Sequence, residues 1–370
     1  MIVDVYIVEE KMKNIFKVFI YKFLRKKGYQ DYMISILLKE VYNDFFKNKQ
    51  TTLKEKIWSY KRGFISSKIK NYGLTDSNYK DFLNDFDYYR LYPLNSPNWS
   101  KLIDDKLTTK YVLGKYMPEY YFNIDAKGKI IAMQDYYKKD VNVEDVIDLI
   151  KEKKILAFKL SGGSLGVGFY KVSFNDDFYI NSKKVSEQEV INFVKNLKNY
   201  LITEFIIVHD DIKKYYSKSA NTLRVMVINE EGNNPKIANS FMRFGTSKTG
   251  SVDNASAGGI FTIVDVQNGR YFDAKRVQNG DLILCPIHPD SRLTIEGFLP
   301  HWDMIKEKLI DISLYLPGLK YAGFDIAITN EGFKIIEINS HQDVKWYQYY
   351  YPILKDNQAS EFFINALNDR

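Results

Sequence analysis

Cysteine and histidine are scarce in this chain of 370 residues. It has one cysteine, Cys285, and four histidines. A single cysteine excludes an intrachain disulfide and a zinc site built from several cysteines, and it is consistent with a reducing compartment. The histidines, at positions 209, 288, 301 and 341, do not have the spacing of metal ligands. These shortages argue against a disulfide scaffold and against zinc chemistry.

Long apolar runs are missing as well. No window reaches 18 uncharged apolar residues, so the sequence predicts no transmembrane helix. The first ten residues, MIVDVYIVEE, lack a basic segment ahead of a long apolar stretch, and we expect no secretory signal. We therefore expect a cytoplasmic protein.

Acidic residues are few near the N-terminus. Residues 11–72 hold 16 Lys or Arg against 4 Asp or Glu, a net charge of +12 in a chain whose total is +7. Apolar pairs at helical spacing predict basic helices over residues 10–72, the second beginning at Asp31. Such helices can lie on a membrane, here at its inner face, or can pack on the rest of the protein. No nucleic-acid-binding motif accompanies the charge, so we expect no nucleic acid as a partner.

The sequence divides into three regions. A helical basic region is expected over residues 1–95, with a turn-rich linker over 73–100 and a helix over 101–117. Strand pairs with intervening helices follow, which favour an α+β fold over a doubly wound sheet. We expect a first lobe over 96–200, with a strand at 155–160, and a second lobe over 201–370, with a helix at 301–316.

Two apolar runs near the C-terminus flank Asn330-Glu331-Gly332 and predict a β-hairpin. A turn centred on Glu331 places Asp325 opposite Glu337, and Asn339 shares the face of Glu337. Like charges that face each other destabilise a strand pair, so a cation is expected to neutralise them. Oxygen-only ligands suit Mg²⁺, particularly beside nucleotide phosphates. A solvated sheet face that carries acids by chance is the alternative.

A glycine-rich segment follows the predicted strand that ends near Lys159. Residues 161–168 read SGGSLGVG, and a further strand is predicted after them. Glycines let backbone N–H groups approach phosphate oxygens, and a lysine supplies the opposite charge. The segment has neither the P-loop spacing nor the helix that a dinucleotide-binding fingerprint requires. A glycine loop that covers a nucleotide and an ordinary glycine-containing hairpin both remain open.

Read together, these motifs resemble the ATP-grasp superfamily, and most closely the sugar-transfer-associated ATP-grasp family of bacterial polysaccharide clusters. The resemblance covers residues 100–345. The segments that carry it are SANTLR at 219–224, VDNASAGG at 252–259, HPD at 288–290, LPHW at 299–302, GFDIAIT at 323–329 and EIN at 337–339.

The resemblance implies an ATP-grasp fold in which two α+β lobes enclose ATP, with Mg²⁺ as the second cofactor. It implies that Lys106 and Lys159 contact phosphates and that Arg224 faces the γ-phosphate or an acyl phosphate. The implied metal ligands are Asp325, Glu337 and Asn339. The remaining implied ATP-binding residues are Ser161, Gly163, Ser164 and Gly166 of the glycine-rich loop, together with Glu204, Phe205, Ile206 and Asp211.

The implied activity is an ATP-dependent carboxylate–amine ligase that works through an acyl phosphate, with Arg224 and Lys159 in catalytic roles. By family association it joins an amino acid or amine to a sugar acid in the biosynthesis of bacterial surface polysaccharide or capsule. The substrates are small-molecule or glycan-linked. A kinase that phosphorylates a hydroxyl, and a nucleotide-binding scaffold for glycan assembly, are the alternatives.

Overall fold

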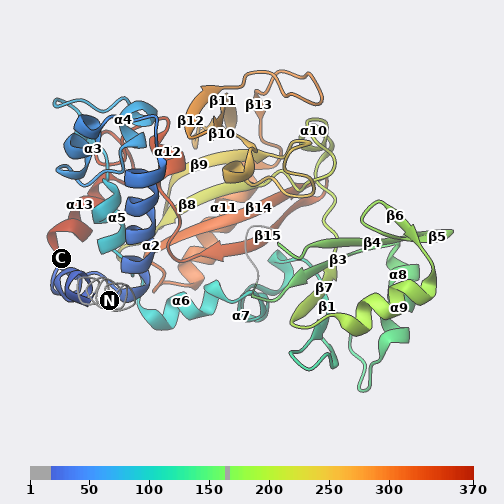
Figure 1. Ribbon diagram of the computed structural model, residues 1–370. Coiled ribbons are helices and arrows are strands. Elements are labelled where there is room, and N and C mark those ends of the chain that lie inside the picture. The colour runs from blue at the N-terminus through green and yellow to red at the C-terminus, as the bar shows by residue number, and fades with distance from the viewer. Residues whose placement is uncertain (1–17, 163–166) are drawn as a thin grey trace, which may run out of the picture. The chain divides into compact units, whose positions relative to one another are not determined.

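A computed structural model describes residues 18–162 and 167–370 (Figure 1). The predicted helix that begins near residue 10 lies partly outside them. The chain forms two compact units. Unit 1 comprises residues 1–94, 279–281 and 343–370, and unit 2 comprises residues 95–278 and 282–342. The domain division that we expect from the sequence, at 95/96 and 200/201, stays a prediction.

Unit 1 is helical. After a helix over 18–26, its elements are α2 (Asp31–Tyr42), the π-helical turn η1 (Asn43–Lys47), α3 (Leu53–Tyr60), α4 (Ser67–Tyr72), η2 (Tyr79–Asp81), α5 (Asp85–Arg90), α12 (Lys345–Gln348) and α13 (Ser360–Asn368). Helix α2 begins at Asp31 as predicted, and its apolar stripe buries Ile34 and Leu37. Thr52 starts α3 with a capping box, in which its side chain and that of Glu55 each accept the other residue's backbone N–H.

Two predictions of secondary structure, for residues 73–100 and 101–117, are wrong. The expected linker over 73–100 contains η2 and α5, because Asn84 caps a helix by accepting the N–H of Asp87. The expected single helix over 101–117 is two helices, α6 (Pro97–Asp104) and α7 (Lys106–Leu113), followed by η3 (Gly114–Tyr116). Asp105 separates them because its backbone is extended and its side chain caps α7.

Unit 2 contains a seven-stranded antiparallel sheet in the order β2-β1-β7-β3-β4-β5-β6. Its strands are β1 (Tyr120–Ile124), β2 (Ile130–Ala132), β3 (Ile155–Leu160), β4 (Tyr170–Asn175), β5 (Asp177–Ile180), β6 (Lys183–Val185) and β7 (Tyr200–Glu204). Helices α8 (Val143–Lys153) and α9 (Glu187–Asn196) pack their apolar faces on this sheet (Figure 1). The predicted strand at 155–160 is β3.

A second antiparallel sheet of unit 2 has the order β12-β11-β10-β9-β8-β14-β15, with β13 beside β11. Its strands are β8 (Leu223–Ile228), β9 (Lys236–Phe244), β10 (Ile260–Val264), β11 (Arg270–Gln278), β12 (Asp281–Leu284), β13 (Gly297–Phe298), β14 (Tyr321–Thr329) and β15 (Gly332–Asn339). The short elements α10 (Asp210–Lys213) and η4 (Ala255–Ala257) and the helix α11 (Trp302–Tyr315) complete the unit. The antiparallel strands with intervening helices confirm the expected α+β class.

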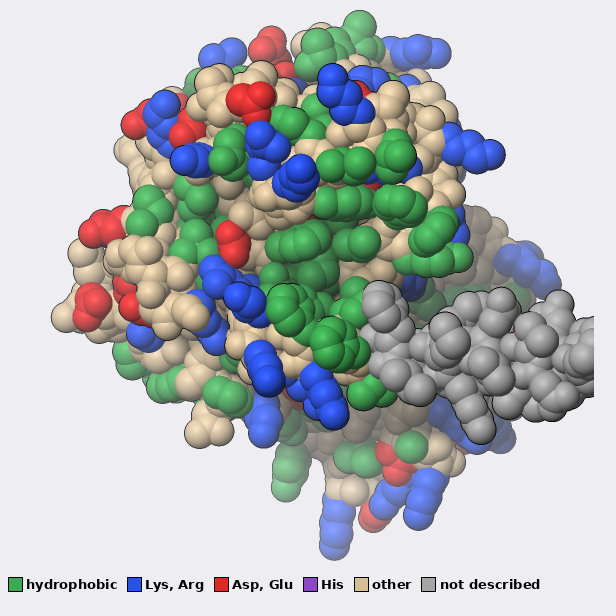
Figure 2. All heavy atoms as spheres, turned by 60° about the vertical axis from the view of Figure 1, so that its left-hand side comes forward, with side chains coloured by type: hydrophobic (Ala, Val, Ile, Leu, Met, Phe, Trp, Pro, Cys, Tyr) green, Lys and Arg blue, Asp and Glu red, His purple; other side chains and the backbone are tan. Residues whose placement is uncertain are grey.

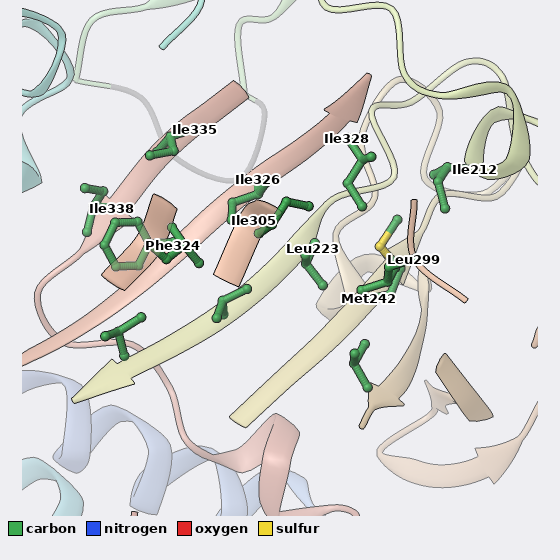
Figure 3. Packing of buried hydrophobic residues seen from close by; sticks show 14 of the residues in the cluster. Ile212, Leu223, Met242, Leu299, Ile305, Phe324, Ile326, Ile328, Ile335 and Ile338 are labelled. Atoms are coloured by element: carbon green, nitrogen blue, oxygen red, sulfur yellow. The ribbon is translucent and has the colours of Figure 1, made fainter. Parts of the chain in front are cut away.

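The two faces of this second sheet differ in chemistry. On one face, Leu223, Phe324 and Ile326 join a large apolar core to which α11 contributes Ile305 (Figure 3). Successive strand residues point to opposite faces. The neighbours of these core residues, Arg224 and Asp325, therefore lie on the other face. The apolar core thus fixes the strands that present the charged residues.

Candidate active site

The hairpin of β14 and β15 brings the predicted acids together. Asp325 pairs with Glu337, and Gly323 pairs with Asn339, as the sequence pattern predicts. The turn is tighter than predicted, since Thr329 pairs with Gly332. A register shift between Asp325 and Ile326 compensates for the shorter turn, because Ile336 is the extra residue of a β-bulge. The bulge therefore restores the Asp325–Glu337 pair.

Asp325 is held by two arginines. Nε and Nη2 of Arg224 donate to its two carboxylate oxygens, the latter at 2.6 Å, and Nη2 of Arg243 lies 3.2 Å from Oδ1. The Asp325 side chain is only 4% exposed. Burial alone raises the pKa of a carboxyl, but the charges of Arg224 and Arg243 outweigh it and hold the pKa of Asp325 well below its usual range. Asp325 is therefore ionised throughout the neutral range.

Arg243 is a residue that our sequence predictions missed. Its Nε donates to Oγ1 of Thr222 at 2.9 Å, and this hydroxyl donates to the carboxylate of Asp253 at 2.6 Å. Asp253 belongs to the VDNASAGG segment that carries the family resemblance. A strand with the sequence KIANSFMRF holds one arginine among apolar residues, and a charge in such a setting is the signal that could have identified it.

Two lysines approach the carboxylates from the first part of unit 2. Lys106 is the first residue of α7, and its Nζ lies 3.3 Å from Oε2 of Glu337. Lys159 on β3 has its Nζ 3.3 Å from the hydroxyl of Tyr120 and 4.7 Å from the centre of that ring. Burial, followed by the charge of Lys106, lowers the pKa of Lys159 to about 8, while Glu337 acts in the opposite direction. The structure thus brings Lys106, Lys159 and Glu337 together.

An ion pair between a buried lysine and an aspartate supports this lysine cluster. Lys110 is 2% exposed and its Nζ lies 2.7 Å from Oδ2 of Asp135. The same oxygen accepts the backbone N–H of Tyr120 at 2.7 Å. The pair therefore fixes the start of β1 and the Tyr120 ring against which Lys159 lies. Sequence reasoning missed it because the two residues are 25 positions apart and belong to different elements.

The structure describes only one of the four predicted ATP-binding residues of the glycine-rich loop. Gly163, Ser164 and Gly166 lie outside the described residues. Ser161 follows β3, and its hydroxyl donates to the carbonyl of Asn199 at 3.1 Å.

The other four predicted ATP-binding residues lie at the end of β7 and after it. Glu204 ends that strand, and its Oε2 accepts the N–H of Glu119 at 3.0 Å and lies 3.6 Å from Nζ of Lys334. Phe205 and Ile206 come directly after it. Asp211 is exposed on α10, near Lys214. Their contacts with a nucleotide stay predictions.

The donor set on the hairpin fits Mg²⁺ in its chemistry. Asp325, Glu337 and Asn339 offer only oxygen or amide donors on one sheet face, and the Glu337 side chain is 32% exposed. The arginines occupy part of the acceptor capacity of Asp325, which leaves Glu337 as the more open ligand. Across residues 18–162 and 167–370, no group of three His, Cys, Asp or Glu side chains has metal-binding geometry. The predicted set of two carboxylates and one amide is not a group of this kind, because Asn339 is not among the four residue types.

The family comparison identifies the class of the chain. A family model described as sugar-transfer associated ATP-grasp matches residues 85–355, and the chain belongs to this family. This membership confirms the predicted resemblance and the ATP-grasp fold. The family description supports ATP as a ligand, and the ligase activity and Mg²⁺ stay predictions. None of the curated proteins compared with the chain matches it.

Solved structures with a similar fold are distant in sequence. The ATP-grasp ligase PsnB, complexed with its minimal precursor, Mg and ADP, is 12% identical, with a TM-score of 0.39 over 74% of this chain and 62% of that chain. D-alanine–D-alanine ligase from Bacillus anthracis is 13% identical, with a TM-score of 0.36 over 74% and 69%. D-alanyl-alanine synthetase A from Vibrio cholerae O1 is 13% identical, with a TM-score of 0.42 over 74% and 67%. The chain spans less than two thirds of the length of PsnB, and the family match carries the identification.

Proposed function

We propose that this chain is a carboxylate–amine ligase that activates a substrate carboxylate as an acyl phosphate. The observation that carries the proposal is the meeting of Lys106, Lys159 and Glu337 beside the Arg224–Asp325 pair. Cations from a helix and from two sheets surround a pair of acids that could hold a metal. Phosphoryl transfer needs this kind of positioning and charge neutralisation and little covalent chemistry from the protein.

The residues have distinct proposed roles. Lys106 and Lys159 hold ATP phosphates, and Glu337, Asn339 and Asp325 are the ligands for Mg²⁺. When bound, Mg²⁺ would supply positive charge that offsets the charge of the phosphates during transfer. The guanidinium of Arg224, planar and permanently charged, would bind phosphate oxygens of the activated substrate.

The reaction balances in two steps. A substrate carboxylate oxygen bonds to the γ-phosphorus while the bond to the ADP oxygen breaks. An amine nitrogen then bonds to the acyl carbon, inorganic phosphate leaves, and the nitrogen gives up a proton to solvent. Arg224 and Lys159 stabilise the charge on the phosphoryl oxygens in both steps.

The substrate class and location are also proposals. The family's association with sugar transfer supports a sugar acid as the carboxylate and an amino acid or amine as its partner, in bacterial surface polysaccharide or capsule synthesis. The acceptor would be free, nucleotide-linked or lipid-linked. We also propose that the chain acts in the cytoplasm at the inner face of the membrane, through its basic N-terminal helices. No helix in the described part of the chain is both long and apolar enough to cross a bilayer.

Hydroxylamine trapping tests the reaction. The protein is incubated with Mg-ATP, hydroxylamine and pools of uronic acids, nucleotide-linked uronic acids and amino acids, and ADP and hydroxamate are measured together. We expect hydroxamate to form with ADP, which would also name the carboxylate class. Phosphorylated alcohol with ADP and no hydroxamate would contradict the ligase and favour a kinase, and neither product from any pool would favour a scaffold.

Glu337→Gln tests the site itself. We expect this variant to lose ADP formation, by roughly 100-fold or more, because it removes a metal-facing charge. Glu331→Gln, at an exposed position in the turn of the same hairpin, is the matched control and should retain activity. Equal ADP formation by both variants would contradict the proposed role of Glu337 as a metal ligand.

A further inference from the structure

Unit 1 exposes a cluster of apolar side chains where α2 ends. Phe46 is 65% exposed, Leu53 is 61% exposed and Tyr42 is 55% exposed. Large side chains of this kind are more often buried than exposed to water. Figure 2 shows hydrophobic side chains gathered on the face of the helices of unit 1, with Lys and Arg around them. We call the following residues the aromatic patch: Tyr42, Phe45, Phe46, Leu53 and Ile57.

Contacts below the surface hold the aromatic patch in place. The ring of Phe46 lies 5.0 Å from the rings of both Tyr42 and Phe45. The buried Lys56 donates to the carbonyls of Phe45 at 2.9 Å and of Asn48 at 2.7 Å, which fastens η1 to α3. The rings are therefore presented from a fixed turn.

Most exposed charges around the patch are positive, and the carboxylate of the partly exposed Glu55 is held in the capping box of α3. Lys47, Lys49 and Lys54 are exposed within the same stretch of chain, and Nζ of Lys47 lies 5.8 Å from the centre of the Tyr42 ring. Over residues 18–61 the exposed charged side chains are all bases apart from Asp31, which pairs with Arg25. A surface of this kind attracts anions and offers apolar groups to a less polar phase.

We propose that the aromatic patch and its lysines dock on the surface of a bilayer that contains anionic phospholipids. Aromatic rings and Leu or Ile enter the boundary between headgroups and acyl chains, while lysines contact the phosphates and keep their charge in water. Charge complementarity favours this partner, because each basic residue near an anionic leaflet adds to the attraction. The inference specifies the membrane location proposed above and does not depend on the ligase reaction.

Vesicle co-sedimentation tests the docking surface. The full-length protein is mixed with vesicles of phosphatidylcholine alone or with one third phosphatidylglycerol, at low and at high salt. We expect binding to the anionic vesicles only, and less binding at high salt because exposed charges are screened. Lys47→Gln/Lys49→Gln/Lys54→Gln should weaken the partitioning by roughly ten-fold or more, and Phe46→Ser/Leu53→Ser should weaken it at both salt concentrations.

Leu284→Ser/Phe298→Ser is the matched control, since these side chains of unit 2 are 70% and 63% exposed. It should bind vesicles like the unchanged protein. ADP formation in solution, measured on all variants, should not change, so that failure of the docking surface is distinguished from failure of the ligase. Unchanged vesicle binding in Phe46→Ser/Leu53→Ser would overturn the proposal. So would a dimer in light scattering that this variant abolishes, because a second copy would then occupy the patch.

Discussion

The carboxylate of Asp325 is paired with two arginines, which stabilise its buried charge and limit its capacity to bind a metal. Asp325 is buried although it lies on the charged face of the sheet, and a buried charge is tolerated only when it is paired and hydrogen-bonded. Arg224 and Arg243 provide that pairing. They also compete with any metal for the same oxygens, since a carboxylate has about four acceptor positions. We therefore expect the affinity of the proposed metal site to depend most on Glu337, which is less buried.

At the residue scale, the proposed phosphate contact of Lys159 predicts that the use of ATP depends on pH. The pKa of Lys159 in the folded chain is lowered to about 8, mainly by burial and then by Lys106. Above this pH we expect the amine to be neutral, so that it could no longer offset the charge of a phosphate in the proposed site. We expect kcat/KM for ATP, which reports the free enzyme, to fall by up to about ten-fold per pH unit above about 8.

Lys159→Arg is the control, because a guanidinium stays protonated over this range. Its kcat/KM is expected to be lower overall but flat between pH 8 and pH 9.5. The same decline in the variant as in the unchanged protein would assign the titration to another group.

The same lysine affects stability with a defined sign. An unfolded lysine has a pKa near 10.4, above the value in the folded chain, so the unfolded state binds the proton more readily. The charge therefore lowers the free energy of unfolding below pH 8, and this cost is relieved as the pH rises from about 8 to 10.4.

Local patterns predicted part of the site, and long-range pairing decided the rest. The positions of Asp325, Glu337 and Asn339 follow from strand alternation and a short turn, which a sequence displays directly. The partners of Asp325 do not, because Arg224 and Arg243 reach it across strands about 100 and 80 positions away in the chain. Periodicity contains no information on such pairs.

At the element scale, the hairpin pairs Asp325 with Glu337 as predicted, but through a tighter turn and a β-bulge that were not predicted. The prediction assumed a turn centred on Glu331, whereas the strands close around Asn330 and Glu331 with Thr329 opposite Gly332. Without the bulge at Ile336, Asp325 would face Ile336 and the acids would not meet. A one-residue shift exchanges the faces of a strand. The burial of Ile335 and Ile338 on the core side therefore requires the bulge.

The position of Lys106 depends on how the first turn of α7 is capped. Oδ1 of Asp105 accepts the N–H of Thr108 at 2.8 Å and its hydroxyl at 3.0 Å, and Lys106 is the next residue. Asp105→Ala removes this cap, which we expect to cost about 1 kcal/mol of stability and to raise the KM for ATP several-fold, since the first turn would fray. Chemical unfolding and ATP kinetics measure the two effects.

Asp105→Asn keeps a good capping side chain and is the matched variant. It is expected to remain close to the unchanged protein in both measurements. If Asn is as damaging as Ala, the negative charge of Asp105 rather than the cap supports the site.

At the scale of the whole molecule, unit 1 is built from both ends of the chain. Gln348 exchanges hydrogen bonds with the backbone of Leu83, at 2.8 Å and 3.0 Å, and the guanidinium of Arg370 donates to the carbonyls of Leu91 and Pro93. The sequence gives no sign of this return, because the contacts span more than 260 positions. The C-terminal segment is therefore part of the basic helical unit and completes the scaffold that presents the aromatic patch.

Phe363 on α13 tests this arrangement. Its side chain is fully buried in unit 1, whereas the neighbouring Ile364 is 42% exposed. We expect Phe363→Ala to lower the free energy of unfolding by about 3–5 kcal/mol, because it leaves a cavity, and Ile364→Ala to change it by about 0.5 kcal/mol or less. Hydrogen exchange followed by mass spectrometry measures both variants peptide by peptide. In Phe363→Ala, peptides from residues 18–94 should lose protection although they lie at the opposite end of the sequence. If protection falls only within residues 343–370, the C-terminal segment is an appendage that unit 1 does not need, and if it falls equally in residues 95–278, the two units unfold as one.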